Sequence, residues 1–218
     1  MMKYLVILLS DQSTSFCYYN SSDNIEENRL IPLEILRNAI KYAFMEDLFI
    51  QFVLPPFSLP KEYEEIIAST KGSIIAPHST SYNADVIVID GFSELNNIEI
   101  LKDVSYVLRS DKKDFFEQHK EITRRIVEFS RLNIVLTDIE SFIDDDFNLY
   151  KQILDEFTCS VKDIILSGKT IQLNILTDRL VKNEMNNCNA GSKTITLAPN
   201  GQFYICPAFY YAKEQSVG

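Results

Sequence analysis

Cysteine, histidine, glycine and tryptophan are scarce in this chain of 218 residues, which has four, two, six and none of them. The cysteines lie far apart in the sequence, and a chain of this length buries enough apolar surface to fold without cross-links. This usage excludes a secreted disulfide framework and predicts a protein of the reducing cytoplasm. Strings typical of P-loops, serine-hydrolase elbows and zinc proteases are also missing.

Basic residues and long apolar runs are few as well. Lysine and arginine total 21 against 31 aspartates and glutamates, and the formal net charge is -10. A general nucleic-acid or anionic-membrane binder needs a basic surface, so we expect neither partner. The apolar run that follows Lys3 is too short for a signal-peptide core, and no run approaches the roughly 20 residues of a membrane-spanning helix.

Apolar runs alternate with helical periodicity along the chain. The runs 4–9 and 84–90 predict buried strands, whereas 33–45 and 112–131 carry apolar residues at helical spacing. This alternation predicts an α/β fold, with a mostly parallel sheet or a partial barrel. Further strands are expected at 48–54, 74–75, 105–108, 133–136 and 171–176, and further helices at 60–68, 94–101 and 147–166.

Three sets of residues have competing interpretations: an acidic segment, one histidine and five tyrosines. The acidic residues Asp138, Glu140, Asp144, Asp145 and Asp146 precede a predicted helix, so we interpret them as capping and solvated groups, with a divalent-metal site as the alternative. His78 is a candidate acid/base residue or an ordinary surface side chain. Five tyrosines could line a peptide groove or the edge of the core: Tyr18, Tyr19, Tyr204, Tyr210 and Tyr211.

A β-hairpin is predicted near the C-terminus. Two short runs rich in Thr, Ile, Phe and Tyr flank Pro199-Asn200-Gly201, where Asn and Gly tolerate the positive φ of a tight turn. Cys188 stands before the first run and Cys206 ends the second. The hairpin would bring the two thiols towards each other, as metal ligation requires, although plain packing of cysteine is the alternative.

This hairpin resembles the start of a SPASM domain, the auxiliary iron–sulfur module of many peptide-modifying radical-SAM enzymes. The resemblance implies that Cys188 and Cys206 ligate a [4Fe-4S] cluster whose remaining ligands lie further downstream. No cysteine follows Cys206 here. The chain is therefore expected to be either an N-terminal piece of a longer protein or a relic without a cluster.

The loop after the first predicted strand departs from the radical-SAM pattern. Where those enzymes carry three cysteines, this sequence has Ser10, Thr14 and Phe16-Cys17. Hydroxyls are poor substitutes for thiolates, so one cysteine cannot hold the cluster that binds S-adenosylmethionine. The glycine-rich stretch expected after the second strand is replaced by Leu54-Pro-Pro-Phe57. Radical-SAM activity and S-adenosylmethionine are therefore not expected.

Taken whole, the sequence resembles the CXXX repeat peptide maturase family. The resemblance implies a partial (β/α) barrel of radical-SAM-like type over residues 1–182 and the start of a SPASM-like domain over 183–218. It also implies a role in maturing a ribosomally synthesised cysteine-repeat peptide, with catalytic residues unknown. The strings that carry it, besides the hairpin, are Lys3–Asp11, Ser15–Tyr19, Ile31–Glu34, Ile50–Phe52, Leu59–Tyr63 and Ala84–Val88.

Two alternatives stay open. The chain could be a non-catalytic scaffold that binds the precursor peptide and presents it to a second maturation enzyme. It could also be an unrelated α/β domain that binds a small ligand. A stoichiometric redox-active cluster would favour an enzyme, tight peptide binding by metal-free protein would favour the scaffold, and failure to recognise the peptide would favour the small-ligand domain.

Overall fold

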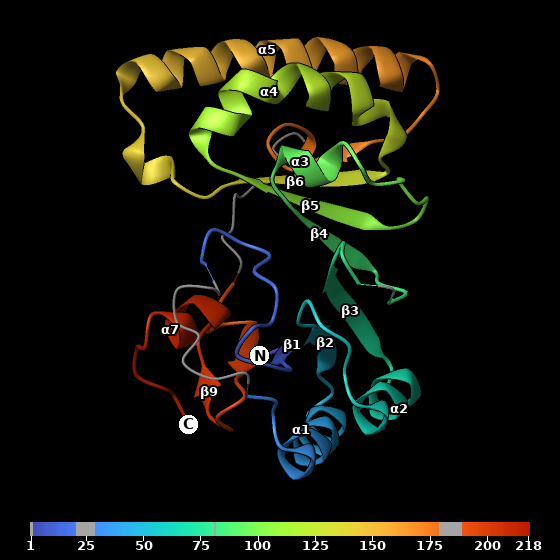
Figure 1. Cartoon of the computed structure of the whole chain (residues 1–218), viewed down its shortest axis with the longest axis vertical. Coiled ribbons are helices and arrows are strands. Elements are labelled where there is room, and N and C mark those ends of the chain that lie inside the picture. Colours follow the sequence, from blue (N-terminus) through green and yellow to red (C-terminus); the bar gives the residue numbers. More distant parts are fainter. Residues whose placement is uncertain (1, 21–28, 81, 179–188) are drawn as a thin grey trace. The chain divides into compact units, whose positions relative to one another are not determined.

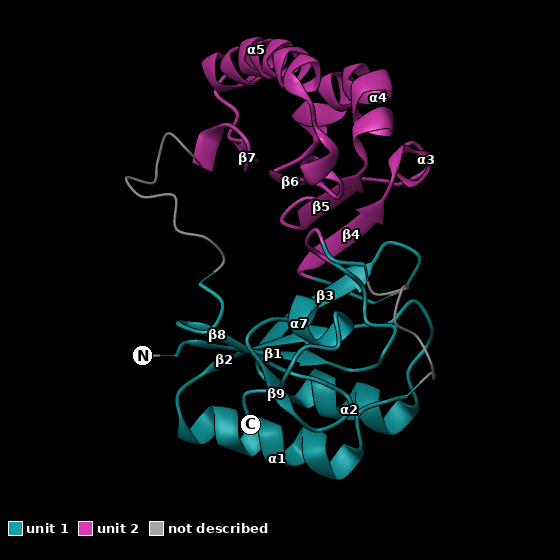
Figure 2. Ribbon diagram, turned by 90° about the vertical axis from the view of Figure 1, so that its left-hand side faces the viewer, with its two compact units in different colours: residues 1–15, 19–84, 186–218 teal, residues 16–18, 85–185 magenta. Residues whose placement is uncertain are grey.

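The computed structural model describes residues 2–20, 29–80, 82–178 and 189–218. These form two compact units (Figure 2). Unit 1 contains residues 1–15, 19–84 and 186–218, and unit 2 contains residues 16–18 and 85–185. The predicted domain boundary between residues 182 and 183 lies outside the described residues, so that division stays a prediction.

Unit 1 has five described strands in the order β3-β2-β1-β8-β9. Neighbouring strands are parallel except for the antiparallel pair β8 and β9. The central strand β1 is an apolar run whose Leu5, Ile7 and Leu8 are fully buried. The strands are β1 (Tyr4–Leu8), β2 (Phe49–Val53), β3 (Gly72–Pro77), β8 (Thr194–Leu197) and β9 (Phe203–Tyr204).

Helices α1 (Leu33–Met45) and α2 (Lys61–Ser69) connect the first three strands and cover one face of the sheet of unit 1 (Figure 1). Each begins directly after a proline, whose fixed φ suits the start of a helix. In α1 the buried residues recur every three or four positions, so one side of the helix packs inward. They are Leu36, Ala39, Ile40 and Ala43.

Unit 2 has four described strands in the order β7-β6-β5-β4, all parallel. Helices α4 and α5 lie side by side over this sheet and share its core, which includes Tyr106, Phe115 and Phe157 (Figure 1). The strands are β4 (Val86–Asp90), β5 (Ser105–Ser110), β6 (Arg131–Leu136) and β7 (Gln172–Leu173). The helices are α3 (Phe92–Leu95), α4 (Lys112–Arg125), η2 (Ile126–Glu128), η3 (Ile139–Ser141) and α5 (Asp144–Leu166).

The α/β class and the mostly parallel strands are confirmed, and barrel closure stays a prediction. The predicted hairpin is present as β8 and β9, with Gly201 in its turn at a φ of 81°. Its membership of a SPASM-type domain stays a prediction. The sequence did not indicate that β8 also pairs in parallel with β1. No described helix is long and apolar enough to cross a membrane.

Candidate functional site

The loop that follows β1 is held in place by buried serines. The Ser10 N–H donates to Ser13 Oγ at 3.0 Å, and Ser13 Oγ donates to the Val53 carbonyl of β2 at 2.8 Å. The Ser10 hydroxyl accepts a hydrogen bond from the Gln12 N–H at 3.1 Å. Both serines are fully buried. Their hydroxyls therefore fix the backbone at the carboxyl end of β1, where α/β folds usually place their binding sites.

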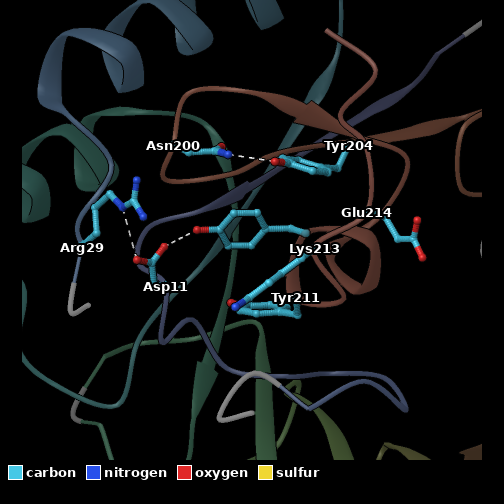
Figure 3. A pocket seen from close by; sticks show the side chains of 8 residues that line it. Asp11, Arg29, Asn200, Tyr204, Tyr211, Lys213 and Glu214 are labelled. Carbon is cyan, nitrogen blue, oxygen red and sulfur yellow. Dashed lines mark hydrogen bonds and ion pairs between the residues drawn. The ribbon is translucent and has the colours of Figure 1, made fainter. Parts of the chain in front are cut away.

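Asp11 is the acidic residue that this loop positions. It is 6% exposed, and its carboxylate pairs with Arg29 Nε at 3.3 Å and accepts a hydrogen bond from the Tyr210 hydroxyl (Figure 3). The Asp11 N–H donates to the Arg29 carbonyl at 3.0 Å, so the two residues are also joined through the backbone. A buried carboxylate needs such partners because it has lost most of its hydration.

The short helix α7 (Pro207–Tyr211) places two tyrosines beside this loop. Pro207 occupies its first turn and Cys206 is its extended N-cap residue, an arrangement that favours a helix start. The Tyr211 hydroxyl donates to the Ser13 carbonyl at 3.2 Å, and the Tyr211 ring stacks on Tyr19 at 5.4 Å. Together with the Tyr210 bond to Asp11, these contacts fasten α7 to the loop.

Two tyrosines of this site, Tyr210 and Tyr211, are neutral donors. Burial, and then the nearby Asp11 carboxylate, raise the pKa of Tyr210 far above its ordinary value. Burial also raises the pKa of Tyr211. The centre of the Tyr210 ring lies 5.3 Å from that of Tyr204 and 5.2 Å from that of Tyr211, and both pairs pack edge to face. The group therefore offers aromatic surface and hydroxyls, and the raised pKa values keep Tyr210 and Tyr211 protonated near neutral pH.

A pocket of about 270 Å³ opens between the loop, the hairpin and α7 (Figure 3). Asn200 of the hairpin turn donates to the Tyr204 hydroxyl at 2.8 Å and so orients one wall. The volume is close to the lower limit of about 300 Å³ for small-ligand sites, which suits one peptide residue better than a nucleotide. The lining residues are Asp11, Arg29, Asn200, Tyr204, Tyr210, Tyr211, Lys213 and Glu214.

Only one of the two predicted metal ligands lies in the described part of the chain, so their ligation stays a prediction. Cys206 is half-buried at the start of α7, and Cys188 lies outside the described residues. Among the residues placed by the structure, no group of three or more Cys, His, Asp and Glu side chains could hold a metal ion. The described residues therefore do not by themselves complete the ligand set of an iron–sulfur cluster.

The other predicted candidates have separate positions. His78 follows β3, is half-buried and does not line the pocket. Asp146 accepts the Ile143 N–H at 3.0 Å and pairs with Lys112 at 2.8 Å. Asp138 accepts the Lys112 N–H at 2.9 Å. The capping interpretation of the acidic segment is thus confirmed for Asp146 at the start of α5, whereas Asp138 accepts from the first residue of α4, a different helix.

Sequence reasoning found only part of the pocket. Tyr204, Tyr210 and Tyr211 were candidate groove residues and do line it, whereas Asp11 and Arg29 were not singled out. The position of Asp11, just after a buried strand, could have indicated it. No comparable signal was available for Arg29.

No protein-family model matches the sequence, and no curated protein matches it. Two solved structures of SuiB from Streptococcus suis are similar over 99% of this chain. One is bound to the precursor peptide SuiA (TM-score 0.55, 11% identity). The other is bound to S-adenosylmethionine (TM-score 0.56, 12% identity). The chain covers 62% and 63% of these two chains, and at such identities the likeness is one of fold.

Proposed function

We propose that this chain binds the precursor of a ribosomally synthesised peptide and takes part in its maturation. The observation that carries the proposal is the pocket at the carboxyl end of β1, which the Asp11, Arg29 and Tyr210 contacts organise. The fold is shared with SuiB, which in one structure is bound to its precursor peptide. A peptide-binding role agrees both with that fold and with the side chains that line the pocket.

The pocket's side chains suit a peptide residue with its backbone. Arg29 and Lys213 supply positive charge, Asp11 and Glu214 supply negative charge, and tyrosine rings form much of the wall. Such a surface can accept the amides of a peptide and one polar or aromatic side chain. Because Asp11 is already engaged by Arg29 and Tyr210, its role is to fix those two groups.

Binding is favoured over radical chemistry by the residues of the loop itself. The family resemblance aligns Ser10 and Thr14 with two of the cluster cysteines. Ser10 uses its hydroxyl to accept the Gln12 N–H, and the Thr14 N–H donates to the Leu54 carbonyl at 2.9 Å. The first of these side chains thus has a structural task in the loop. This structural use of Ser10, at a position where radical-SAM enzymes carry a cluster cysteine, favours the scaffold alternative, in which a second enzyme performs the reaction.

Cysteine-repeat specificity rests on the family resemblance alone. A titration tests it together with the pocket: a fluorescein-labelled peptide with several Cys-X-X-X repeats is added to metal-free protein under reducing conditions, and anisotropy is recorded. We expect saturable binding that weakens about tenfold or more in Arg29→Gln and Lys213→Gln, because each removes a charge from the pocket. A repeat peptide with serine in place of cysteine tests the sequence preference.

Lys169→Gln is the matched control, since Lys169 is an exposed residue beyond α5 that does not line the pocket. Its binding curve should superimpose on that of the parent protein. Equal affinity in the parent, the pocket variants and the control would show that the pocket is not the binding site. No measurable affinity for either peptide would remove the proposed function altogether.

A further inference from the structure

Unit 2 exposes an apolar patch that the pocket of unit 1 does not involve. We call it the Ile143 patch; it comprises Ile139, Phe142, Ile143 and Phe147, between the end of β6 and the second turn of α5. Ile139 is 50% exposed, Ile143 63% and Phe147 49%. Large apolar side chains gathered in this way, with polar neighbours, are typical of surfaces that a partner covers.

The segment carrying the patch is held rigidly. Lys112 Nζ donates to the Ser141 carbonyl at 3.0 Å and to the Asp146 carboxylate at 2.8 Å. The Asp146 carboxylate also accepts the Ile143 N–H at 3.0 Å, and Asp138 accepts the Lys112 N–H at 2.9 Å. These bonds tie the start of α5 to the start of α4. A surface fixed in this way loses little conformational entropy when a partner binds.

Aromatic side chains pack against one another within the patch and against Phe116 of α4. The centre of the Phe142 ring lies 5.5 Å from that of Phe116 and 5.4 Å from that of Phe147. Lys112 Nζ lies 5.9 Å from the centre of the Phe142 ring. Ile143 is the extended N-cap residue of α5, and the Phe147 N–H donates to its carbonyl at 3.1 Å, so the two residues are neighbours at the start of the helix. Two neighbouring apolar anchors are therefore presented to solvent on a packed base.

The rim of the patch is acidic. Glu140, Asp144 and Asp145 are exposed beside the apolar side chains, and Lys112, whose Nζ lies 5.9 Å from the centre of the Phe142 ring, is paired with Asp146. The chain as a whole carries a net charge of -10. A complementary partner therefore combines apolar side chains with positive charge.

We propose that the Ile143 patch binds a basic amphipathic segment of a polypeptide partner, in which apolar anchors lie next to lysine or arginine. The apolar side chains would cover Ile143 and Phe147, and the cations would face Glu140, Asp144 and Asp145. The patch belongs to unit 2 and uses no residue of the pocket, so this inference stands independently of the proposed function.

The test uses a fluorescein-labelled amphipathic peptide of leucine and lysine, titrated with the full chain and followed by anisotropy. The double variant Ile143→Ser/Phe147→Ser should bind the peptide at least about tenfold more weakly, because it removes both apolar anchors. The control is Ile165→Ser/Leu166→Ser at the other end of α5, whose side chains are 51% and 74% exposed. It should bind like the parent chain.

A second pair of variants distinguishes binding through the acidic rim from nonspecific attraction of a basic peptide to an acidic protein. The rim variant Glu140→Gln/Asp144→Asn/Asp145→Asn should weaken binding several-fold at low salt and flatten its salt dependence. The control Glu62→Gln/Asp155→Asn/Asp163→Asn removes the same charge from exposed positions that are not part of the patch or its rim. Circular dichroism checks that all variants are folded.

Three results would overturn the proposal. The first is equal binding by the patch double variant and its control. The second is an equal loss in the two charge variants, which would make the attraction a property of the net charge. The third is a dimer in sedimentation experiments that Ile143→Ser/Phe147→Ser abolishes, which would assign the patch to a second copy of the chain.

Discussion

Two adjacent arginines show how much the surroundings of a residue decide its importance. Arg125 is 7% exposed, and its guanidinium donates to the Leu95 carbonyl, to the Ile98 carbonyl at 2.9 Å and to Glu128 at 2.7 Å. The side chain of Arg124 is 70% exposed and pairs with Glu121. Arg125 therefore joins the end of α4 to the segment after α3, whereas Arg124 makes a surface ion pair.

We expect Arg125→Met to lower the free energy of unfolding by about 2–4 kcal/mol, because it leaves the buried Leu95 carbonyl and the partly buried Ile98 carbonyl without this donor and Glu128 without its partner. Urea unfolding followed by circular dichroism measures the change. Arg124→Met is the control and should change stability little, since exposed ion pairs contribute little. Similar losses in both variants would contradict the assignment of Arg125 as a buried tie.

For single residues, the sequence indicated which residue types could line a site but not which residues contact one another. It gave the tyrosines of the pocket as candidates, but the bond from Tyr210 to Asp11 joins positions at opposite ends of the chain. Local patterns carry no information on such contacts. Asp146 was easier to interpret, because helix capping is a local interaction.

Among the elements, the hairpin turn depends on a glycine for two reasons. Gly201 has a φ of 81°, which side chains other than glycine adopt with strain. A Cβ at this position would also lie 2.7 Å from Cδ1 of Ile35 in α1. The turn thus packs closely on the helix that covers unit 1.

We expect Gly201→Ala to destabilise the protein by more than the roughly 1 kcal/mol that positive φ alone costs. Gly168→Ala isolates that backbone cost, because Gly168 has a φ of 83° and open space around it. Thermal unfolding compares the two. Ile35→Val in the Gly201→Ala background removes the clashing methyl group and should recover part of the difference; no recovery would mean that Ile35 is not the obstacle.

Elements with a strong period or an apolar run were predicted well. Residues 33–45 form α1, and the predicted strand 84–90 corresponds to β4. The short helix expected at 94–101 lies instead at Phe92–Leu95, where few residues leave little periodicity to detect. Helix α7 was missed for the same reason, although Pro207 is typical of a helix start.

For the whole molecule, the open question is the iron–sulfur cluster. Two thiols, Cys188 and Cys206, do not complete a four-ligand site, so their ligation stays a prediction for a protein that supplies further ligands. We expect this chain to retain no stoichiometric iron and acid-labile sulfide after anaerobic reconstitution. A cluster retained by the parent chain and lost in Cys188→Ala and Cys206→Ala would contradict that expectation and favour redox chemistry.

The position of β8 beside β1 has a consequence for the order in which the protein is made. β1 ends at Leu8, whereas its neighbour β8 begins at Thr194, so this edge of β1 stays open until residues 194–197 have left the ribosome. The described strands of unit 2, β4 to β7, all lie between these two strands in the sequence. Unit 2 can therefore pair its strands during synthesis before β8 joins the sheet of unit 1.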